Sequence, residues 1–267
     1  MRCTMLGISF LLLSAAHPFA LPSATQQRDA SAIATLQRSI LALAGAGAGA
    51  INAAPISSVQ IAGSITPIAG SGYPAGTFTW TFEITNSGYQ FRNELQTNGT
   101  TRVFVSGHGS PANGSNGKVK HTFSHMALAE TPSAVPMVVL ISVVVNPKYT
   151  ITQAPSVQIG VIATRHVHIS DDKDQVTQAV TPQEWYFDPT SSLPLRVEYR
   201  IPDLLDPLSS IKGARDFANY RQLGGFLVPT QITSSVDGEP VCVTTISSVI
   251  LNVPVNESEF DLTGEGN

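Results

Sequence analysis

The stretch QEWYFDPTSSLPLRVEYRI, from Gln183 to Ile201, predicts a strand, a turn and a second strand. Apolar and polar side chains alternate along its second half. The apolar set is Leu193, Leu195, Val197, Tyr199 and Ile201, and the other set is Pro194, Arg196, Glu198 and Arg200. Because successive strand side chains point to opposite faces, we expect the first set to be buried and the charges to face water. Asp188 and Pro189 are typical of the turn between the strands.

Alternation of this kind recurs along most of the chain. Besides the hairpin, strands are predicted at Ser57–Ile65, Thr77–Thr85, Tyr89–Leu95, Thr100–Ser106, Tyr149–Gln153, Ser156–His168, Asp216–Leu223, Phe226–Ser234 and Val241–Val253. The Gly- and Ser-rich segment 108–118 and the segment 204–215 are predicted to be loops, the second with room for a short helix. About ten strands in hairpin order are too many for a flat sheet, so we expect the sheet to curl.

Two segments have a helical pattern. Ile33, Leu36, Ile40 and Leu43 recur at spacings of three and four residues between Asp29 and Gly45, which predicts an amphipathic helix. From His125 to Val145 the chain is apolar with breaks at Pro132 and Pro136, and it predicts two short helices, the second almost wholly apolar. The valines between residues 138 and 145 leave a buried strand as the alternative.

Composition and the first residues indicate an exported protein. The chain has 267 residues, of which 42% are hydrophobic and only 13% charged, and a net charge of −4 without a basic patch, which argues against nucleic-acid binding. Leu6 to Ala16 is an apolar run that ends in the small residues Ser14 to Ala16, so residues 1–20 are predicted to be a cleaved signal peptide, too short to span a membrane. We expect one domain over residues 29–262 and a tail at 263–267. Its single remaining cysteine, Cys242, cannot form an internal disulfide.

No catalytic motif stands out. His166 and His168 share a strand face and are followed by Asp171, Asp172 and Asp174, so a metal-dependent enzyme is one hypothesis. The third ligand is not fixed by any recognisable spacing, and a solvated polar face explains the same residues. We therefore expect no metal, no cofactor and no enzymatic activity.

The hairpin motifs carry a family resemblance. Trp185–Pro189 with Leu193–Tyr199, and DFANYR from Asp216 followed by GFLVP from Gly225, resemble consecutive hairpins of the periplasmic lipoprotein-carrier superfamily, the LolA/LolB/RseB-like proteins. The likeness covers about Asp29 to Leu262 and is greatest with uncharacterised exported bacterial members. It implies a half-barrel: an antiparallel sheet curled around an apolar cavity, with helices as a lid.

The sequence therefore favours a mainly β protein with a few helices, periplasmic or secreted. We expect it to hold an apolar ligand, such as a lipid or a lipoprotein acyl chain, between sheet and helices. The candidate cavity residues are Phe78, Trp80, Phe82, Val139, Leu140, Leu195, Val197 and Tyr199. The alternative is an envelope structural or sensory interaction domain in which the same side chains form a filled core.

Overall fold

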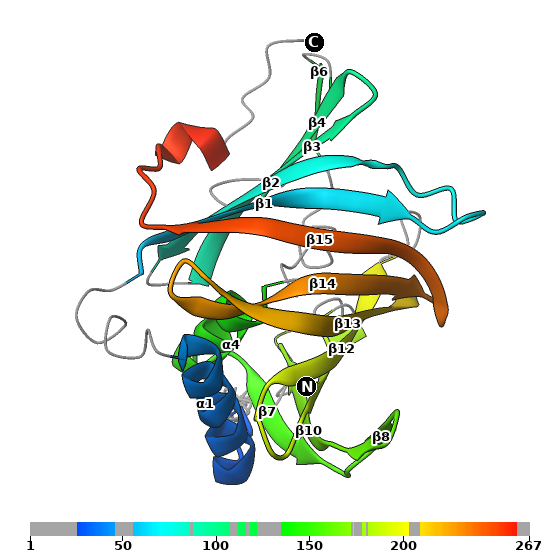
Figure 1. Cartoon of the computed structure of the whole chain (residues 1–267). Coiled ribbons are helices and arrows are strands. Elements are labelled where there is room, and N and C mark those ends of the chain that lie inside the picture. Colours follow the sequence, from blue (N-terminus) through cyan, green and yellow to red (C-terminus); the bar gives the residue numbers. More distant parts are fainter. Residues whose placement is uncertain are drawn as a thin grey trace, which may run out of the picture.

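The computed structural model describes residues 26–45, 56–85, 88–106, 112–115, 118–121, 135–171, 173, 178–179, 181–202 and 209–260. The predicted signal peptide and the tail at 263–267 lie outside these ranges. Most of the described chain is a single antiparallel sheet that curves around two helices, as Figure 1 shows. The predicted mainly β class with a curled sheet and few helices is confirmed.

Thirteen described strands form this sheet, in the order β6-β5-β4-β3-β2-β1-β15-β14-β13-β12-β11-β10-β7. The strands of the first half are β1 (Ser58–Pro67), β2 (Gly76–Thr85), β3 (Gly88–Thr97), β4 (Thr100–Ser106), β5 (Ala112–Ser115) and β6 (Lys118–His121). Those of the second half are β7 (Thr150–Ala154), β10 (Arg165–Ser170), β11 (Gln183–Phe187), β12 (Pro194–Pro202), β13 (Ser210–Leu223), β14 (Phe226–Val236) and β15 (Glu239–Leu251). A separate two-stranded hairpin contains β8 (Gln158–Ile159) and β9 (Ile162–Ala163).

The two halves of the chain meet where the first strand pairs with the last, β1 with β15. The chain leaves the sheet at one edge, after β6, and re-enters at the opposite edge as β7. The segment between these strands must therefore pass from one edge of the sheet to the other. Helix α4 (Pro136–Val145) lies within this crossover.

Helix α4 is the apolar helix predicted from the sequence, and the strand alternative is wrong for residues 136–145. Pro136 occupies its first turn, where the missing N–H costs nothing, and seven of its ten residues are buried. The predicted helix that precedes it lies outside the described residues.

Helix α1 (Ala30–Ala44) also follows the predicted pattern. Leu36 and Leu43 are fully buried, and the helix ends at Gly45, whose φ of 51° favours glycine. Helix α1 packs on α4 and on β7, β10 and β14. The two helices and the sheet share one core cluster, which includes Ile151 of β7 and Trp185 of β11.

The hairpin at 183–201 has the predicted turn. The Asp188 carboxylate accepts hydrogen bonds from the backbone N–H groups of Thr190 at 2.7 Å and Ser191 at 2.9 Å. Val197 is fully buried and Tyr199 packs against the core, whereas Arg200 is exposed. The expected assignment of faces therefore holds for this part of β12.

Leu195 departs from the strict alternation. Tyr186 pairs with Arg196 while Phe187 pairs with Pro194, so Leu195 is an extra residue in β12. Its side chain is only partly buried and is not among the residues of the core cluster, while its neighbour Pro194 is buried.

Three predictions about segments are wrong. Residues 156–168 are not one strand, because Gly160, with a φ of 59°, turns the chain between β8 and β9. The segment 204–215 contains the start of β13, and the segment 108–118 contains β5. After β15 the chain forms a 3-10 helix (Glu257–Phe260) in which Phe260 is buried.

The burial of α4 gives a direct test. Leu140 is 0% exposed and Val145, on the same helix, is 68% exposed. We expect Leu140→Ala to lower the free energy of unfolding by about 2–5 kcal/mol, because it leaves a cavity in the core. Val145→Ala should change it by less than about 0.5 kcal/mol. Urea unfolding followed by tryptophan fluorescence measures both, and equal effects would contradict the packing of α4 described above.

Candidate apolar binding site

The concave face of the sheet is aromatic on β2, β3 and β4. Phe78 and Trp80 stack with ring centroids 4.2 Å apart, and Phe82 stacks on Phe91 at 4.8 Å. Register explains this, because Phe78, Trp80 and Phe82 pair on one face with Gly63, Ile61 and Val59 of β1. These side chains are buried in the core cluster.

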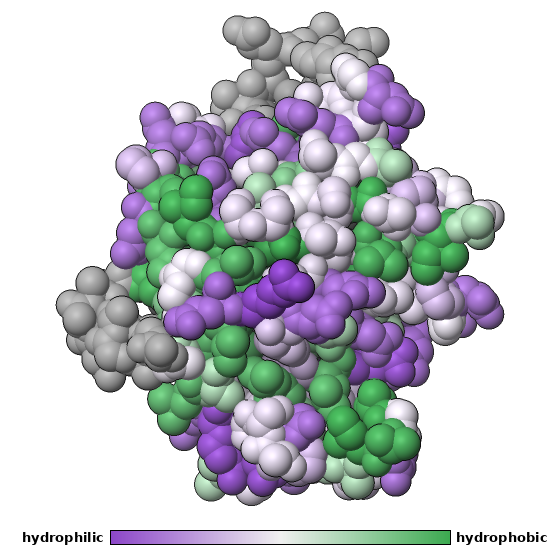
Figure 2. Space-filling view, viewed as in Figure 1, coloured by the Kyte–Doolittle hydropathy of each residue, from purple (hydrophilic) through white to green (hydrophobic). Residues whose placement is uncertain are grey.

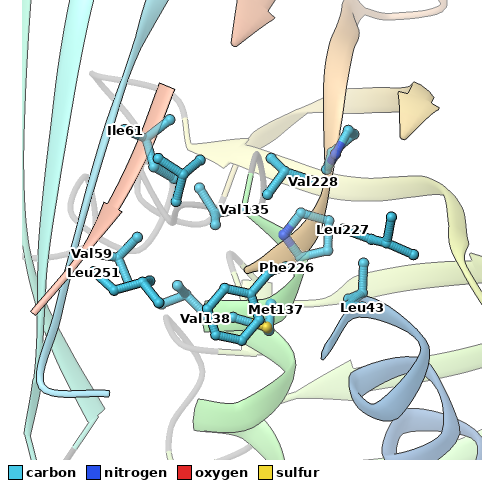
Figure 3. A pocket seen from close by; sticks show the side chains of 13 residues that line it. Leu43, Val59, Ile61, Val135, Met137, Val138, Phe226, Leu227, Val228 and Leu251 are labelled. Carbon is cyan, nitrogen blue, oxygen red and sulfur yellow. The ribbon is translucent and has the colours of Figure 1, made fainter. Parts of the chain in front are cut away.

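A pocket opens where the helices meet the strands. It lies between the last turn of α1, the first turn of α4 and strands β1, β14 and β15, as Figure 3 shows. Every lining side chain is apolar: Leu43, Val59, Ile61, Val135, Pro136, Met137, Val138, Phe226, Leu227, Val228, Pro229, Val249 and Leu251. The volume open to the centre of a water molecule is about 20 Å³, room for one or two waters. In this conformation the pocket is a narrow apolar seam.

None of the eight candidate cavity residues lines this pocket. Seven of them belong to the core cluster or pack against it: Phe78, Trp80, Phe82, Val139, Leu140, Val197 and Tyr199. Leu195 is the partly buried extra residue of β12. The pocket is lined by neighbouring positions on the same faces, such as Val59 and Ile61, which pair across from Phe82 and Trp80.

The pocket residues could be recognised from sequence only as buried positions. Leu43 belongs to the predicted stripe of α1, and Val249 and Leu251 belong to a predicted strand. Their periodicity shows that they face the core, and it carries no signal for which core residues border a gap. The gap depends on how the ends of α1 and α4 meet the sheet.

The two helices are fixed at the end opposite the pocket. Arg28, just before α1, donates from its guanidinium to the backbone carbonyls of Val144 at 2.7 Å, Asn146 at 2.8 Å and Tyr149 at 3.3 Å. It therefore caps the C-terminus of α4, where the helix dipole favours a cation. The carboxylate of Asp29 accepts from the backbone N–H of Gln153 in β7 at 3.0 Å. Polar contacts thus fasten the helices near β7.

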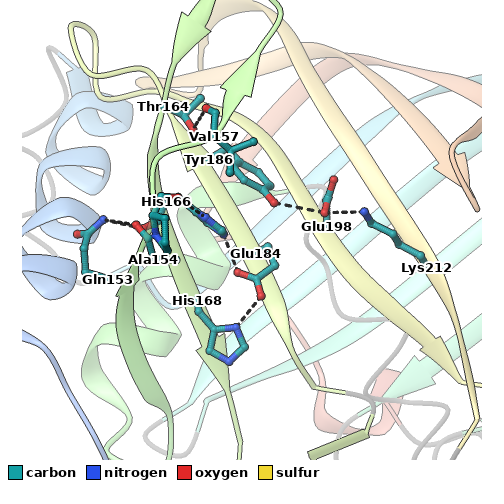
Figure 4. Close-up of polar contacts among 11 residues, drawn as sticks. Gln153, Ala154, Val157, Thr164, His166, His168, Glu184, Tyr186, Glu198 and Lys212 are labelled. Carbon is teal, nitrogen blue, oxygen red and sulfur yellow. Dashed lines mark hydrogen bonds and ion pairs between the residues drawn. The ribbon is translucent and has the colours of Figure 1, made fainter.

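The outer face of the sheet carries the histidine pair of the metal hypothesis. Figure 4 shows that both rings contact one carboxylate: His166 Nε2 is 2.7 Å from Glu184 Oε2, and His168 Nδ1 is 2.7 Å from Glu184 Oε1. Across the strands, Tyr186 donates to Glu198 at 3.3 Å, and Lys212 pairs with Glu198 at 2.9 Å. The expected solvated polar face is here an ordered ladder of hydrogen bonds and ion pairs.

These contacts shift the pKa values of Glu184 and His166. Burial raises the pKa of Glu184, but hydrogen bonds from both histidines and their charges outweigh burial and lower this pKa from its ordinary 4.5 to about 2. Burial lowers the pKa of His166, but its bonds to Glu184 and to the Pro155 carbonyl, with the charges of Glu184 and Glu198, raise it above 6.5.

Within the part of the chain that the structure describes, no group of three or more His, Cys, Asp or Glu side chains is placed to hold a metal ion. Asp171 lies elsewhere, paired with Lys148 at 3.4 Å. Asp172 and Asp174 are outside the described residues. Of the helices described, none has the length and apolar character needed to cross a membrane.

Comparison with known proteins identifies the fold. No protein-family model and no curated protein matches the sequence. Among solved structures, a DUF1329 family protein from Desulfovibrio piger and a putative outer membrane lipoprotein-sorting protein domain from Vibrio parahaemolyticus both align with a TM-score of 0.56 at 12% identity. The alignments cover 86% of this chain and 97% and 96% of those chains. A LolA superfamily protein from Nitrosomonas europaea aligns over 86% of this chain and 97% of its own, with a TM-score of 0.48 at 11% identity. The alignments with the first two structures confirm the fold implied by the sequence motifs, a curled antiparallel sheet with few helices.

Removing the Arg28 cap tests how the helices are fastened. We expect Arg28→Ala to lower the free energy of unfolding by about 1.5–3 kcal/mol, because several part-buried carbonyls lose a charged donor. Amide hydrogen exchange should accelerate in the last turn of α4. Arg38→Ala is the matched control, since the bonds of Arg38 within the described residues go to Ala34 and Thr35 of its own helix. Equal losses in the two variants would contradict a specific cap.

The lowered pKa of Glu184 predicts an acid dependence. A depressed folded-state pKa contributes stability that is complete above pH 4.5 and is lost as the pH falls towards 2. Because the carboxylate is part-exposed, we expect only about 1 kcal/mol after allowance for solvent screening. The free energy of unfolding, measured with urea at about pH 5 and pH 3, should therefore change less between these two pH values in Glu184→Gln than in the unaltered protein. If the free energy of unfolding changed equally in both proteins, Glu184 would make no such pH-dependent contribution to stability.

Proposed function

We propose that this chain is an exported, non-enzymatic binding protein that holds an apolar ligand between the concave face of its sheet and helices α1 and α4. The ligand class is a lipid or a lipoprotein acyl chain, and one domain over residues 29–262 forms the binding unit. The observation that carries the proposal is the wholly apolar seam between helices and sheet, which leads onto a concave face rich in aromatic side chains.

The apolar lining of the seam allows it to widen without the loss of side-chain hydrogen bonds. Its lining side chains are hydrocarbon or thioether, so no side-chain hydrogen bond is broken when Leu43 and Met137 move away from Val228. The lost contacts are non-directional, and an acyl chain replaces them at about 0.8 kcal/mol for each buried CH₂ group. The hydrogen bonds of Arg28 hold the helices together at the end far from the pocket. The C-terminus of α1 and the N-terminus of α4, which line the pocket, are therefore the parts that can move.

The structural comparisons support the same class. The protein from Vibrio parahaemolyticus with this fold is described as a putative outer membrane lipoprotein-sorting domain. That description, the apolar seam and the predicted signal peptide agree on an exported carrier of apolar groups. The seam must widen to admit a chain, because about 20 Å³ is far less than an acyl chain needs.

One observation favours a second candidate. The seam is narrow, and most of the expected cavity residues are packed in the core. A filled core is what an envelope structural or sensory interaction domain would have. Ligand uptake distinguishes the two candidates directly.

The test uses a tryptophan placed in the seam. Native mass spectrometry of protein from an expression host, and titration with a fluorescent fatty acid, should both show one bound ligand for each chain. Val249→Trp fills the seam and should weaken binding at least tenfold. Ile250→Trp is the matched control, because Ile250 is 52% exposed and does not line the pocket. Circular dichroism verifies the fold of each variant. No ligand and no uptake by the unaltered protein would refute the carrier proposal and favour the filled-core candidate.

A further inference from the structure

The ring of His166 lies between two hydrogen-bond acceptors. Its Nδ1 atom is 2.9 Å from the backbone carbonyl oxygen of Pro155, and its Nε2 atom is 2.7 Å from the carboxylate of Glu184. A carbonyl cannot donate, and an ionised carboxylate cannot donate either. A neutral imidazole has a single N–H, so both contacts can be hydrogen bonds only when the ring is an imidazolium.

From this geometry we propose that His166 is a proton-operated clamp for the β8–β9 hairpin. In its protonated form the ring joins the loop after β7, through Pro155, to Glu184 of β11. In its neutral form it keeps the stronger, charge-assisted bond to Glu184 and loses the donor that faces Pro155. The inference concerns the outer face of the sheet and does not depend on the ligand proposed above.

The groups around the ring come from several elements. From β10 itself, His168 bonds the other oxygen of Glu184. From β11, the ring of Tyr186 stacks on His166 with centroids 4.4 Å apart. The more distant charges on β12 and β13 are Glu198, Arg196, Lys212 and Asp216, which pair with one another. From β7, the uncharged Gln153 donates to the backbone carbonyl of His166 at 2.7 Å.

The clamp acts at the root of the hairpin. Close to Pro155, the backbone N–H and the hydroxyl of Thr164 both donate to the carbonyl of Val157, at 3.0 and 2.7 Å. Beyond this root the hairpin projects from the sheet, and Val161 at its turn is 95% exposed. Figure 2 shows apolar surface in this region, at the lower right. The proposed clamp therefore adds a proton-dependent contact beside the root of an exposed apolar hairpin.

The direction of the pH effect follows from the raised pKa of His166. Stabilisation by a group with a raised folded-state pKa is complete below its unfolded value, near 6.5, and is lost as the pH rises through the folded-state value. The clamp is therefore closed in mildly acidic solution and opens towards alkaline pH. Because the neutral ring keeps its bond to Glu184, only the part of the pKa elevation that comes from the Pro155 contact is linked to opening, and each unit of that part corresponds to about a tenfold change in the opening equilibrium.

Two measurements on the full protein test the clamp. In ¹⁵N-histidine NMR spectra at about pH 6, both ring nitrogens of His166 should carry protons, and its pKa should exceed 6.5. As the pH rises through the pKa of His166, the exchange protection of the Thr164 amide, corrected for intrinsic rates, should fall by about tenfold for each pKa unit that the Pro155 contact contributes. Amides in the centre of β14 should show no such change.

Three variants separate the clamp from general effects. His166→Gln should give low Thr164 protection that no longer depends on pH in this range, whereas His168→Gln should keep the dependence, because the bond to Pro155 is made by His166. If His166→Gln does not fold, Glu184→Gln still tests the proposal by lowering the pKa of His166. A neutral ring at pH 6, or Thr164 protection that is constant as the pH rises, would overturn it. So would stoichiometric Zn²⁺ binding by the two histidines after EDTA treatment, because the cluster would then be a metal site.

Discussion

The burial of α4 against the sheet is the constraint on which the rest of the structure depends. The chain must pass from the β6 edge of the sheet to the β7 edge, and it does so with an almost wholly apolar helix in the crossover. Such a helix must bury most of its surface, and seven of its ten residues are buried, so the sheet has to curve around it and α1 has to cover it. Curvature, the shared core and the apolar seam all follow from this packing.

The polar contacts are distributed so that the two ends of the helix pair differ. Near β7, Arg28 and Asp29 bind carbonyl and N–H groups with defined geometry. At the other end, contacts such as that of Leu43 with the strands are apolar and interchangeable. A structure fastened by directional bonds at one end and by non-directional contacts at the other can separate at the second end without losing its register.

Much of the fold could be predicted because the local signals agreed with it. Asp188 and Pro189 favour the turn that they form, and the stripe through Leu36 and Leu43 is the buried face of α1. Predictions failed where one residue changed the geometry: Gly160 reverses the chain inside the segment predicted as one strand, and Leu195 is an extra residue that breaks the alternation. The pocket and the Arg28 cap join segments more than a hundred residues apart in sequence, and periodicity carries no information about such contacts. His166 could be placed on a face with His168, but its second acceptor is a backbone carbonyl, which no residue pattern reveals.

The pairing of β1 with β15 has a consequence for how the protein is made. Val59 pairs with Leu251, so the centre of the sheet is completed only when almost the entire chain is present. Contacts between residues so distant in sequence form slowly, because a long loop must close before they contribute. A nascent chain therefore exposes an unfinished sheet until its last strand has emerged. In the exported protein proposed above, this delay would keep the chain unfolded enough for transport across a membrane. It would also expose the early strands to association with other chains if the last strand is late.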